Sequence, residues 1–173
     1  MSPTFATLRI EEPPLYAPVF MNPTGVAYPC AVHHFQLRHL LAVPSAARIL
    51  FSSRNSEVWQ WDAVGDPDVA ETRLLSFKGE VGPHTSITTL SATPDVLVAG
   101  GYFGELVAKG LGEGAEARVL CTSRDFNITN HIAPFARYSP DGRFLASFND
   151  GASLVFDAHD GGRLIPFFRN PTA

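Results

Sequence analysis

A period of 47 to 48 residues constrains the fold of this 173-residue chain more than any other feature of its sequence. Three segments, which begin at Ile49, Val96 and Phe144, each read as a short apolar strand, a turn, and a second strand with alternating apolar positions. Equivalent apolar positions recur at this spacing: Leu50, Leu97 and Leu145 in the first strand, and Val58, Leu106 and Leu154 in the second. Such regular spacing indicates a structural repeat.

Further strands are expected on either side of each pair. The sequence predicts a preceding strand at Phe35–Ala42, Ser86–Ser91 and Ala133–Tyr138, and a following strand at Thr72–Phe77, Ala117–Thr122 and Arg163–Phe168. Turn residues separate the strands, most clearly at Ser139–Gly142. Four antiparallel strands every 40-odd residues are typical of β-propeller blades, which must stack on one another to bury both faces of each sheet.

We therefore predict an all-β fold, an incomplete propeller of about three four-stranded antiparallel blades, over residues 33–173. The blades are expected at about 33–80, 84–124 and 130–170. Residues 1–32 are predicted to form an irregular N-terminal arm, because prolines at this density exclude helix and central strands: Pro3, Pro13, Pro14, Pro18, Pro23 and Pro29.

The ends of the third strands resemble those of the WD-repeat family. Trp61-Asp62 stands where WD-repeat proteins have their namesake dipeptide, and Phe156-Asp157 stands at the same position in the third unit. The segment Tyr138–Ser147 is similar to the family's usual passage from first to second strand. The resemblance implies a WD-repeat propeller that acts as a protein-binding scaffold.

A closer resemblance is to a group of poorly characterised WD-repeat proteins of fungi and plants. It rests on the segments Phe35–Leu41, Leu97–Leu106 and Ile128–Asn130, and it covers most of residues 35–160. Proteins of this group look like full propellers with further blades. The resemblance carries no activity with it.

In WD repeats, a buried network of His, Ser, Asp and Trp side chains often joins the turn between blades to the third strand. The resemblance implies candidates for this network in the third unit, namely His131, Ser147 and Asp150, with Phe156 in the place of the tryptophan. The second unit departs further, since a Lys-Gly pair replaces Trp-Asp. The network is therefore expected to be partial.

Three blades are fewer than the four or more that a closed propeller needs. An arc of three leaves an open sheet face at each end, which favours pairing with other chains. The chain is therefore expected to be a fragment, a truncated product of a longer gene, or a protein that closes by self-association through its open blade ends.

Charge and hydropathy exclude several classes of partner. Thirteen basic and 17 acidic side chains give a net charge of −4, and the basic residues are scattered singly, so no nucleic-acid-binding surface is expected. No stretch approaches the roughly 20 apolar residues of a membrane span, and no signal-peptide pattern is present. We expect a cytoplasmic or nuclear protein that binds neither nucleic acid nor membranes.

The sequence contains no motif that predicts catalysis or cofactor binding. His33, His34 and His39 cluster, but adjacent strand residues point to opposite faces, and no Cys, Asp or Glu nearby completes a set of metal ligands. The glycines of Gly100–Gly104 precede a strand and not the helix that a phosphate loop requires. We expect no cofactor, no metal and no catalytic residue.

The predicted function is that of a non-enzymatic scaffold for protein–protein interaction. In a propeller, the loops between the fourth and first strands share one face with the loops between the second and third strands. Arginine, aromatic, amide and acidic side chains in these loops form the predicted protein-binding face: Arg54, Asn55, Tyr102, Phe103, Arg124, Asn127, Asn149 and Asp150. The expected partner is another protein.

Two alternatives to a scaffold stay open at this point. A propeller enzyme or small-ligand binder would use the central channel and would place His or carboxylate side chains on the innermost strands. The residues there, around Ile87, Thr88 and Phe135, are mostly apolar or neutral. The other alternative is a truncated product with no independent function.

Overall fold

The computed structural model describes residues 39–53, 56–62, 71–122, 127–134, 142–157 and 164–165. Over these residues the chain is all-β, as predicted, and its strands form three four-stranded antiparallel sheets. In each sheet the strands lie in the order in which they follow along the chain, so each sheet is a meander. The predicted arm at residues 1–32 lies outside the described residues.

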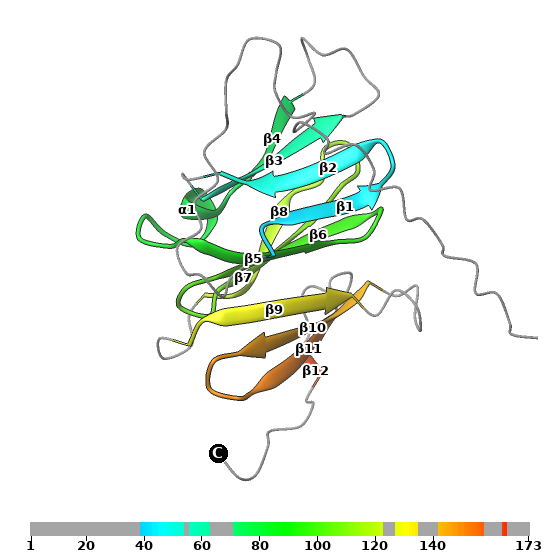
Figure 1. Cartoon of the computed structure of the whole chain (residues 1–173). Helices are drawn as coiled ribbons and strands as arrows, with labels where there is room; N and C mark the ends of the chain where they lie inside the picture. The colour runs from blue at the N-terminus through cyan, green and yellow to red at the C-terminus, as the bar shows by residue number, and fades with distance from the viewer. Residues whose placement is uncertain are drawn as a thin grey trace, which may run out of the picture.

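The three sheets follow one another along the chain. Sheet 1 contains β1 (Leu41–Ser45), β2 (Arg48–Ser52), β3 (Glu57–Asp62) and β4 (Glu71–Ser76). Sheet 2 contains β5 (Ile87–Ala92), β6 (Val96–Gly101), β7 (Leu106–Gly110) and β8 (Ala117–Cys121). Sheet 3 contains β9 (Thr129–Pro134), β10 (Arg143–Phe148), β11 (Ser153–Asp157) and β12 (Leu164–Ile165). Figure 1 shows sheet 2 between the other two.

A short helix, α1 (Phe77–Glu80), follows β4 on the way to sheet 2. Its first residue, Phe77, is fully buried in the core between sheets 1 and 2. Within the part of the chain that the structure describes, no helix is long and apolar enough to cross a membrane.

The period of the sequence is also the period of the strand pairing. The second and third strands of each sheet form its central hairpin. The register pair farthest from the hairpin turn is Arg48 with Asp62, Val96 with Gly110, and Arg143 with Asp157 in the three sheets. From one sheet to the next these pairs advance by 48 and then by 47 residues. The three central hairpins therefore have equivalent registers.

Sheet 2 is buried on both faces, because alternate residues of its central strands enter two different cores. Leu97, Ala99 and Val107 pack with Leu50 and Val58 of sheet 1. Their sequence neighbours share a second core with sheet 3, which contains Val96, Val98, Leu106 and Ala108 from sheet 2 and Ile132, Phe144, Ala146, Phe148 and Phe156 from sheet 3. The unbroken apolar sequence of β6 thus belongs to a strand that is covered on both sides.

The first strands of the three sheets contact one another, β1 with β5 and β5 with β9. The backbone N–H of Leu90 in β5 donates to the carbonyl of His39, which stands two residues before β1, at 2.6 Å. On its other side, the hydroxyl of Thr88 donates to the carbonyl of Thr129 in β9, also at 2.6 Å. Hydrogen bonds therefore tie β5 to chain segments of both neighbouring sheets.

Gly100 allows β6 to approach β9 closely. A Cβ atom at this position would lie 2.5 Å from Cγ2 of Thr129 and 2.8 Å from Cγ2 of Thr89, closer than real side chains allow. Both threonines are fully buried. Packing between sheets 2 and 3 therefore requires a glycine in the interior of this strand.

The first strand of sheet 3 begins earlier than predicted. β9 covers Thr129–Pro134, whereas the sequence predicts a strand at Ala133–Tyr138, of which residues 135–138 lie outside the described residues. The buried residues Thr129 and Ile132 hold β9 against sheet 2, and pairing with β10 begins at Thr129. Contacts between sheets, which the local pattern does not contain, thus determine where this strand starts.

The first strand of sheet 1 lies later in the sequence than the predicted strand Phe35–Ala42, of which residues 35–38 lie outside the described residues. β1 runs through Pro44 to Ser45, beyond the predicted strand end at Ala42. Proline cannot donate a ladder hydrogen bond, and it is tolerated here because β1 is at the edge of its sheet and its register shifts between Ala42 and Ser45.

Candidate interaction face

The turns between the second and third strands contain the same backbone hydrogen bonds in all three sheets. In sheet 2, the N–H of Gly101 donates to the carbonyl of Glu105 at 2.9 Å, and the N–H of Gly104 donates to the carbonyl of Gly101 at 3.2 Å. The equivalent bonds run from Ser53 to Glu57 at 2.9 Å, Ser56 to Ser53 at 3.1 Å, Phe148 to Ala152 at 2.9 Å, and Gly151 to Phe148 at 3.2 Å. This pattern defines a three-residue hairpin loop that ends in a left-handed residue.

The last residue of each loop has the backbone conformation that this turn requires. Its φ is 59° at Ser56, 83° at Gly104 and 76° at Gly151. Glycine adopts this conformation without strain, whereas for other residues it costs about 1–2 kcal/mol. In sheet 1 a hydrogen bond offsets that cost, since the buried Ser56 Oγ donates to the carbonyl of Thr85 at 3.0 Å.

The connections between sheets run beside these turns. The N–H of Tyr102 donates to the carbonyl of Ser86, which precedes β5, and the N–H of Asn149 donates to the carbonyl of Ile128, which precedes β9; both bonds are 3.0 Å long. Turns and connections therefore share one face of the described structure. This turn face consists of Ser56, Thr85–Ser86, Tyr102–Gly104, Asn127–Ile128 and Asn149–Gly151.

Five of the eight residues predicted for the interaction face belong to the turn face: Tyr102, Phe103, Asn127, Asn149 and Asp150. The other three, Arg54, Asn55 and Arg124, lie outside the described residues. The five form two groups, one on the turn of sheet 2 and one on the turn of sheet 3.

The group on sheet 2 is an aromatic pair. Tyr102 is 39% exposed, and its ring meets the half-buried ring of Phe103 edge to face, with 5.5 Å between the ring centroids. The N–H of Phe103 donates to Oε2 of the fully buried Glu105 at 2.8 Å. A buried carboxylate thus fixes the backbone that carries the aromatic pair.

The group on sheet 3 is polar. Nδ2 of Asn127 donates to Oδ2 of Asp150 at 3.2 Å, and the N–H of Ala152 donates to Oδ1 of the same carboxylate at 2.9 Å. Asp150 therefore joins the turn to the connection that precedes β9. Asn149 and Asp150 are both exposed on this turn.

The residues that resemble the WD dipeptide end the third strands of sheets 1 and 3. Trp61 is half-buried and Asp62 is exposed at the end of β3. Phe156 is buried in the core between sheets 2 and 3, and the half-buried Asp157 ends β11. Each aspartate faces an arginine across its hairpin, an arrangement that stabilises antiparallel pairs by about 0.2–1 kcal/mol.

The candidates for the polar network of the third unit lie on β9, on β10 and in the following turn. His131 faces Ser147 across the two strands, and Asp150 lies in the turn. The exposed ring of His131 also contacts the exposed ring of His39, with 4.7 Å between centroids and 58° between planes. Partial burial, and to a lesser degree the nearby His39, lower the pKa of His131 below its ordinary value of 6.5.

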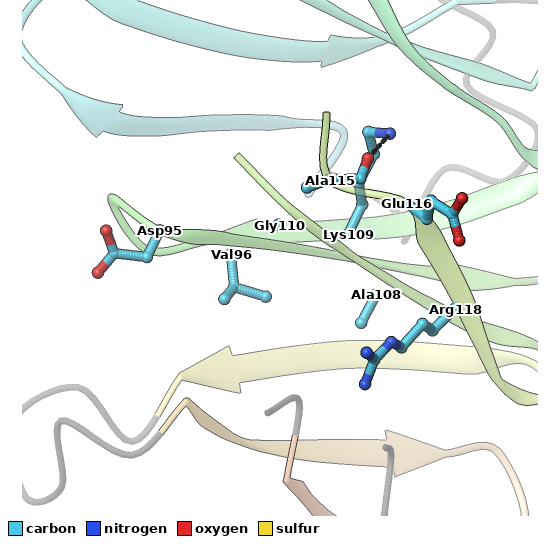
Figure 2. A pocket seen from close by; sticks show the side chains of 8 residues that line it. All are labelled: Asp95, Val96, Ala108, Lys109, Gly110, Ala115, Glu116 and Arg118. Carbon is cyan, nitrogen blue, oxygen red and sulfur yellow. Dashed lines mark hydrogen bonds between the residues drawn. The ribbon is translucent and has the colours of Figure 1, made fainter. Parts of the chain in front are cut away.

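A hollow of about 390 Å³ lies at the opposite end of sheet 2 from the turn face. Figure 2 shows its lining, which consists of Asp95, Val96, Ala108, Lys109, Gly110, Ala115, Glu116 and Arg118. The ammonium of Lys109 donates to the carbonyl of Ala115 at 2.6 Å. None of the five predicted interaction-face residues that the structure describes lines this hollow.

The contacts that join the sheets are not indicated by the sequence pattern. Gly100 packs against Thr129, and His39 contacts His131, although each pair is far apart in the sequence. The one local signal is the glycine inside a strand, which often marks a close approach of another chain segment. No local pattern pairs the two histidines.

Among the residues that the structure describes, no group of three or more His, Cys, Asp or Glu side chains is placed to bind a metal ion. No protein-family model matches the chain, and no curated protein matches its sequence. The turn face is thus defined by its own geometry and residue types.

Proposed function

We propose that the chain is a non-enzymatic protein-interaction module of the WD-repeat β-propeller type, which binds another protein through the turn face. The observation that carries the proposal is one hairpin loop that recurs in three stacked sheets, with equivalent backbone bonds 48 and 47 residues apart. Loops repeated on one side of a stacked array form a continuous surface, and repeat proteins use such surfaces for binding.

Two features support the propeller arrangement. Each sheet is a four-stranded meander, and the first strand of sheet 2 contacts the first strands of both neighbours, as around a propeller axis. Sheet 2 is also enclosed on both faces by the adjacent sheets. A blade that stacks on its neighbours in this way buries surface that it cannot bury alone.

The chemistry of the turn face supports binding to a protein. Tyr102 and Phe103 provide an aromatic pair of the kind that anchors protein interfaces. Asn127, Asn149 and Asp150 provide the polar groups that commonly surround such an anchor. Because a backbone-to-carboxylate hydrogen bond holds each of the two turns, less conformational entropy is lost on binding.

The composition of the innermost strands disfavours the enzyme alternative. The sequences of β1, β5 and β9 are LAVPS, ITTLSA and TNHIAP, and the single ionisable side chain among them is His131. Ile87 and Thr88 are buried, and Phe135 lies outside the described residues. A catalytic channel needs converging acid, base or nucleophilic groups, which these strands do not supply.

We also propose that a second copy of the chain covers the outward face of sheet 1. Leu41 and Val43 on β1 are 54% and 58% exposed. Leu41 faces Phe51, and Phe51 faces Trp59 across the next pair, so the row is apolar across three strands. Light scattering should give a mass above that of one chain, and replacing Leu41 and Val43 with lysine should lower it.

The control for this test is Val119→Lys, which places one lysine at an apolar residue that is 37% exposed on β8. It should leave the mass unchanged. A monomeric wild-type chain at high concentration would exclude self-association without affecting the proposal about the turn face.

Site-specific crosslinking tests the binding role of the turn face. A photoreactive amino acid at Tyr102 or Asn149 should crosslink to a protein partner, whereas the same group at Glu116, beside the hollow at the other end of sheet 2, should not. With the purified partner, Tyr102→Ala should weaken binding about 30-fold if it is a hot spot. Wild-type affinity in Tyr102→Ala and Asn149→Ala, together with a loss in Glu116→Ala, would contradict the proposal.

A further inference from the structure

Two histidines from opposite ends of the sheet stack meet across β5. His39 precedes β1 of sheet 1, and His131 lies in β9 of sheet 3, yet their ring centroids are only 4.7 Å apart. Both backbones are held in place, because the carbonyl of His39 accepts the N–H of Leu90 and β9 pairs with β10 along its length. Both side chains are exposed and therefore accessible to an ion from solvent.

The spacing of the rings is compatible with two imidazoles on one metal ion. A zinc–nitrogen bond is about 2.0–2.1 Å long, and the centre of an imidazole ring lies about 1.2 Å behind its nitrogen. Two imidazoles bound to one ion therefore have ring centres about 4.5 Å apart at a right angle and about 5.2 Å apart at the tetrahedral angle. The observed 4.7 Å lies between these values.

The surroundings select for ions that prefer nitrogen ligands. β1, β5 and β9 carry no carboxylate that would attract a hard cation such as Mg²⁺. They also carry no carboxylate that would favour the protonated form of either ring.

We propose that His39 and His131 together bind one divalent transition-metal ion of the class that prefers imidazole, such as Zn²⁺ or Ni²⁺, with water in the remaining coordination positions. The ion connects sheet 1 to sheet 3 across the first strand of sheet 2. The metal site exists only in the folded protein, because 91 residues lie between the two ligands in the sequence. Metal binding therefore stabilises the stack of three sheets.

The test is a titration of the full chain with Zn²⁺ and with Ni²⁺ by calorimetry, together with thermal unfolding in the presence of each ion. We expect one saturable site per chain and a rise in melting temperature, both abolished by EDTA. Mg²⁺ should produce neither effect. His131→Gln and His39→Gln should each remove the saturable site and the rise in melting temperature.

Two control variants separate this site from the other histidines. His84→Gln changes an exposed histidine just before β5 and should bind metal like the wild type. A triple variant that replaces His33, His34 and His159 with glutamine should also bind. Each variant is first unfolded in EDTA, and a cooperative melt close to that of the wild type shows that it is folded.

The proposal is overturned if the wild-type chain shows no saturable binding, or if binding survives in both His39→Gln and His131→Gln. Binding that is lost in the triple variant and kept in His131→Gln would assign the metal to one or more of those three histidines and would also overturn it. None of these outcomes bears on the turn face, so this proposal and the proposed function fail independently.

Discussion

Two neighbouring threonines in β5 are expected to respond in opposite directions to the same substitution. The hydroxyl of Thr88 donates to the carbonyl of Thr129 at 2.6 Å and to that of Gly100 at 3.2 Å. The hydroxyl of Thr89 is equally buried but has no hydrogen-bond partner. Valine replaces the hydroxyl with a methyl group of similar size, so each substitution isolates the contribution of one hydroxyl.

The expected sizes follow from the hydrogen bonds. Thr89→Val removes an unpaired polar group from a buried site and should raise the free energy of unfolding by about 1–3 kcal/mol. Thr88→Val removes the bond between β5 and β9 and should lower the free energy of unfolding by about 1–3 kcal/mol. In a chain of this length 1 kcal/mol shifts the melting temperature by about 2–4 °C, so the two variants should differ by at least about 4 °C.

Thermal unfolding followed by circular dichroism, with urea titration as a second measure, gives both values. The wild type and the two variants are compared at the same concentration. A Thr89→Val variant that melts below Thr88→Val, or two variants that shift by equal amounts in one direction, would refute the assigned hydrogen bonding and with it the junction between sheets 2 and 3.

Three further predictions concern backbone conformation and packing, and each is measured by the same unfolding assay. Gly151→Ala should lower the free energy of unfolding by about 1–2 kcal/mol, because φ is 76° there although a Cβ atom would meet no neighbour. Gly112→Ala, at a position that is also open but has no left-handed φ, should be neutral or should stabilise by up to about 1 kcal/mol. Equal effects of the two substitutions would contradict the turn assignment. Gly100→Ala should lower stability by about 1–3 kcal/mol because its Cβ would clash with two buried threonines, and an unchanged melting temperature would show that the sheets pack less closely. Ser56→Gly should be close to neutral, since it relieves strain and loses one buried hydrogen bond, whereas Ser56→Ala should destabilise by about 1 kcal/mol or more; a reversed order would exclude this hydrogen bond.

The sequence predicted well what depends on local pattern. The alternation around Leu50, Leu97 and Leu145 reports strands that bury a face, and the turns follow from residues such as Gly104 and Gly151. These features are fixed within about 15 residues of chain, so a single sequence contains enough information to recognise them.

What the sequence predicted poorly depends on contacts between sheets. The start of β9 is set by Thr129, which packs against Gly100 in another sheet, and the local pattern around Ala133 suggested a later start. In the turn of sheet 1, Ser56 has the left-handed conformation that glycine has in the other two turns, and its hydrogen bond to Thr85 was not predictable from the turn itself.

The candidate face shows the same division. That Asn127 and Asp150 belong to one face follows from the repeat, because equivalent loops must share a side of the stack. The hydrogen bond from the Asn127 amide to the Asp150 carboxylate depends on the path of the connection before β9, which the repeat does not determine. The contact between His39 and His131 joins two repeats, and no pattern within either repeat indicates it.

Hydrogen exchange of the backbone amides tests the central claim, that three repeated sheets stack with sheet 2 enclosed between the others. Amides in β6 and β7 should exchange most slowly and should be released together with global unfolding, because both faces of these strands are buried. Amides in the edge strands β4 and β8 should exchange faster. Exchange in β6 and β7 as fast as in β4 and β8 would mean that sheets 1 and 3 do not cover sheet 2, which would contradict the account.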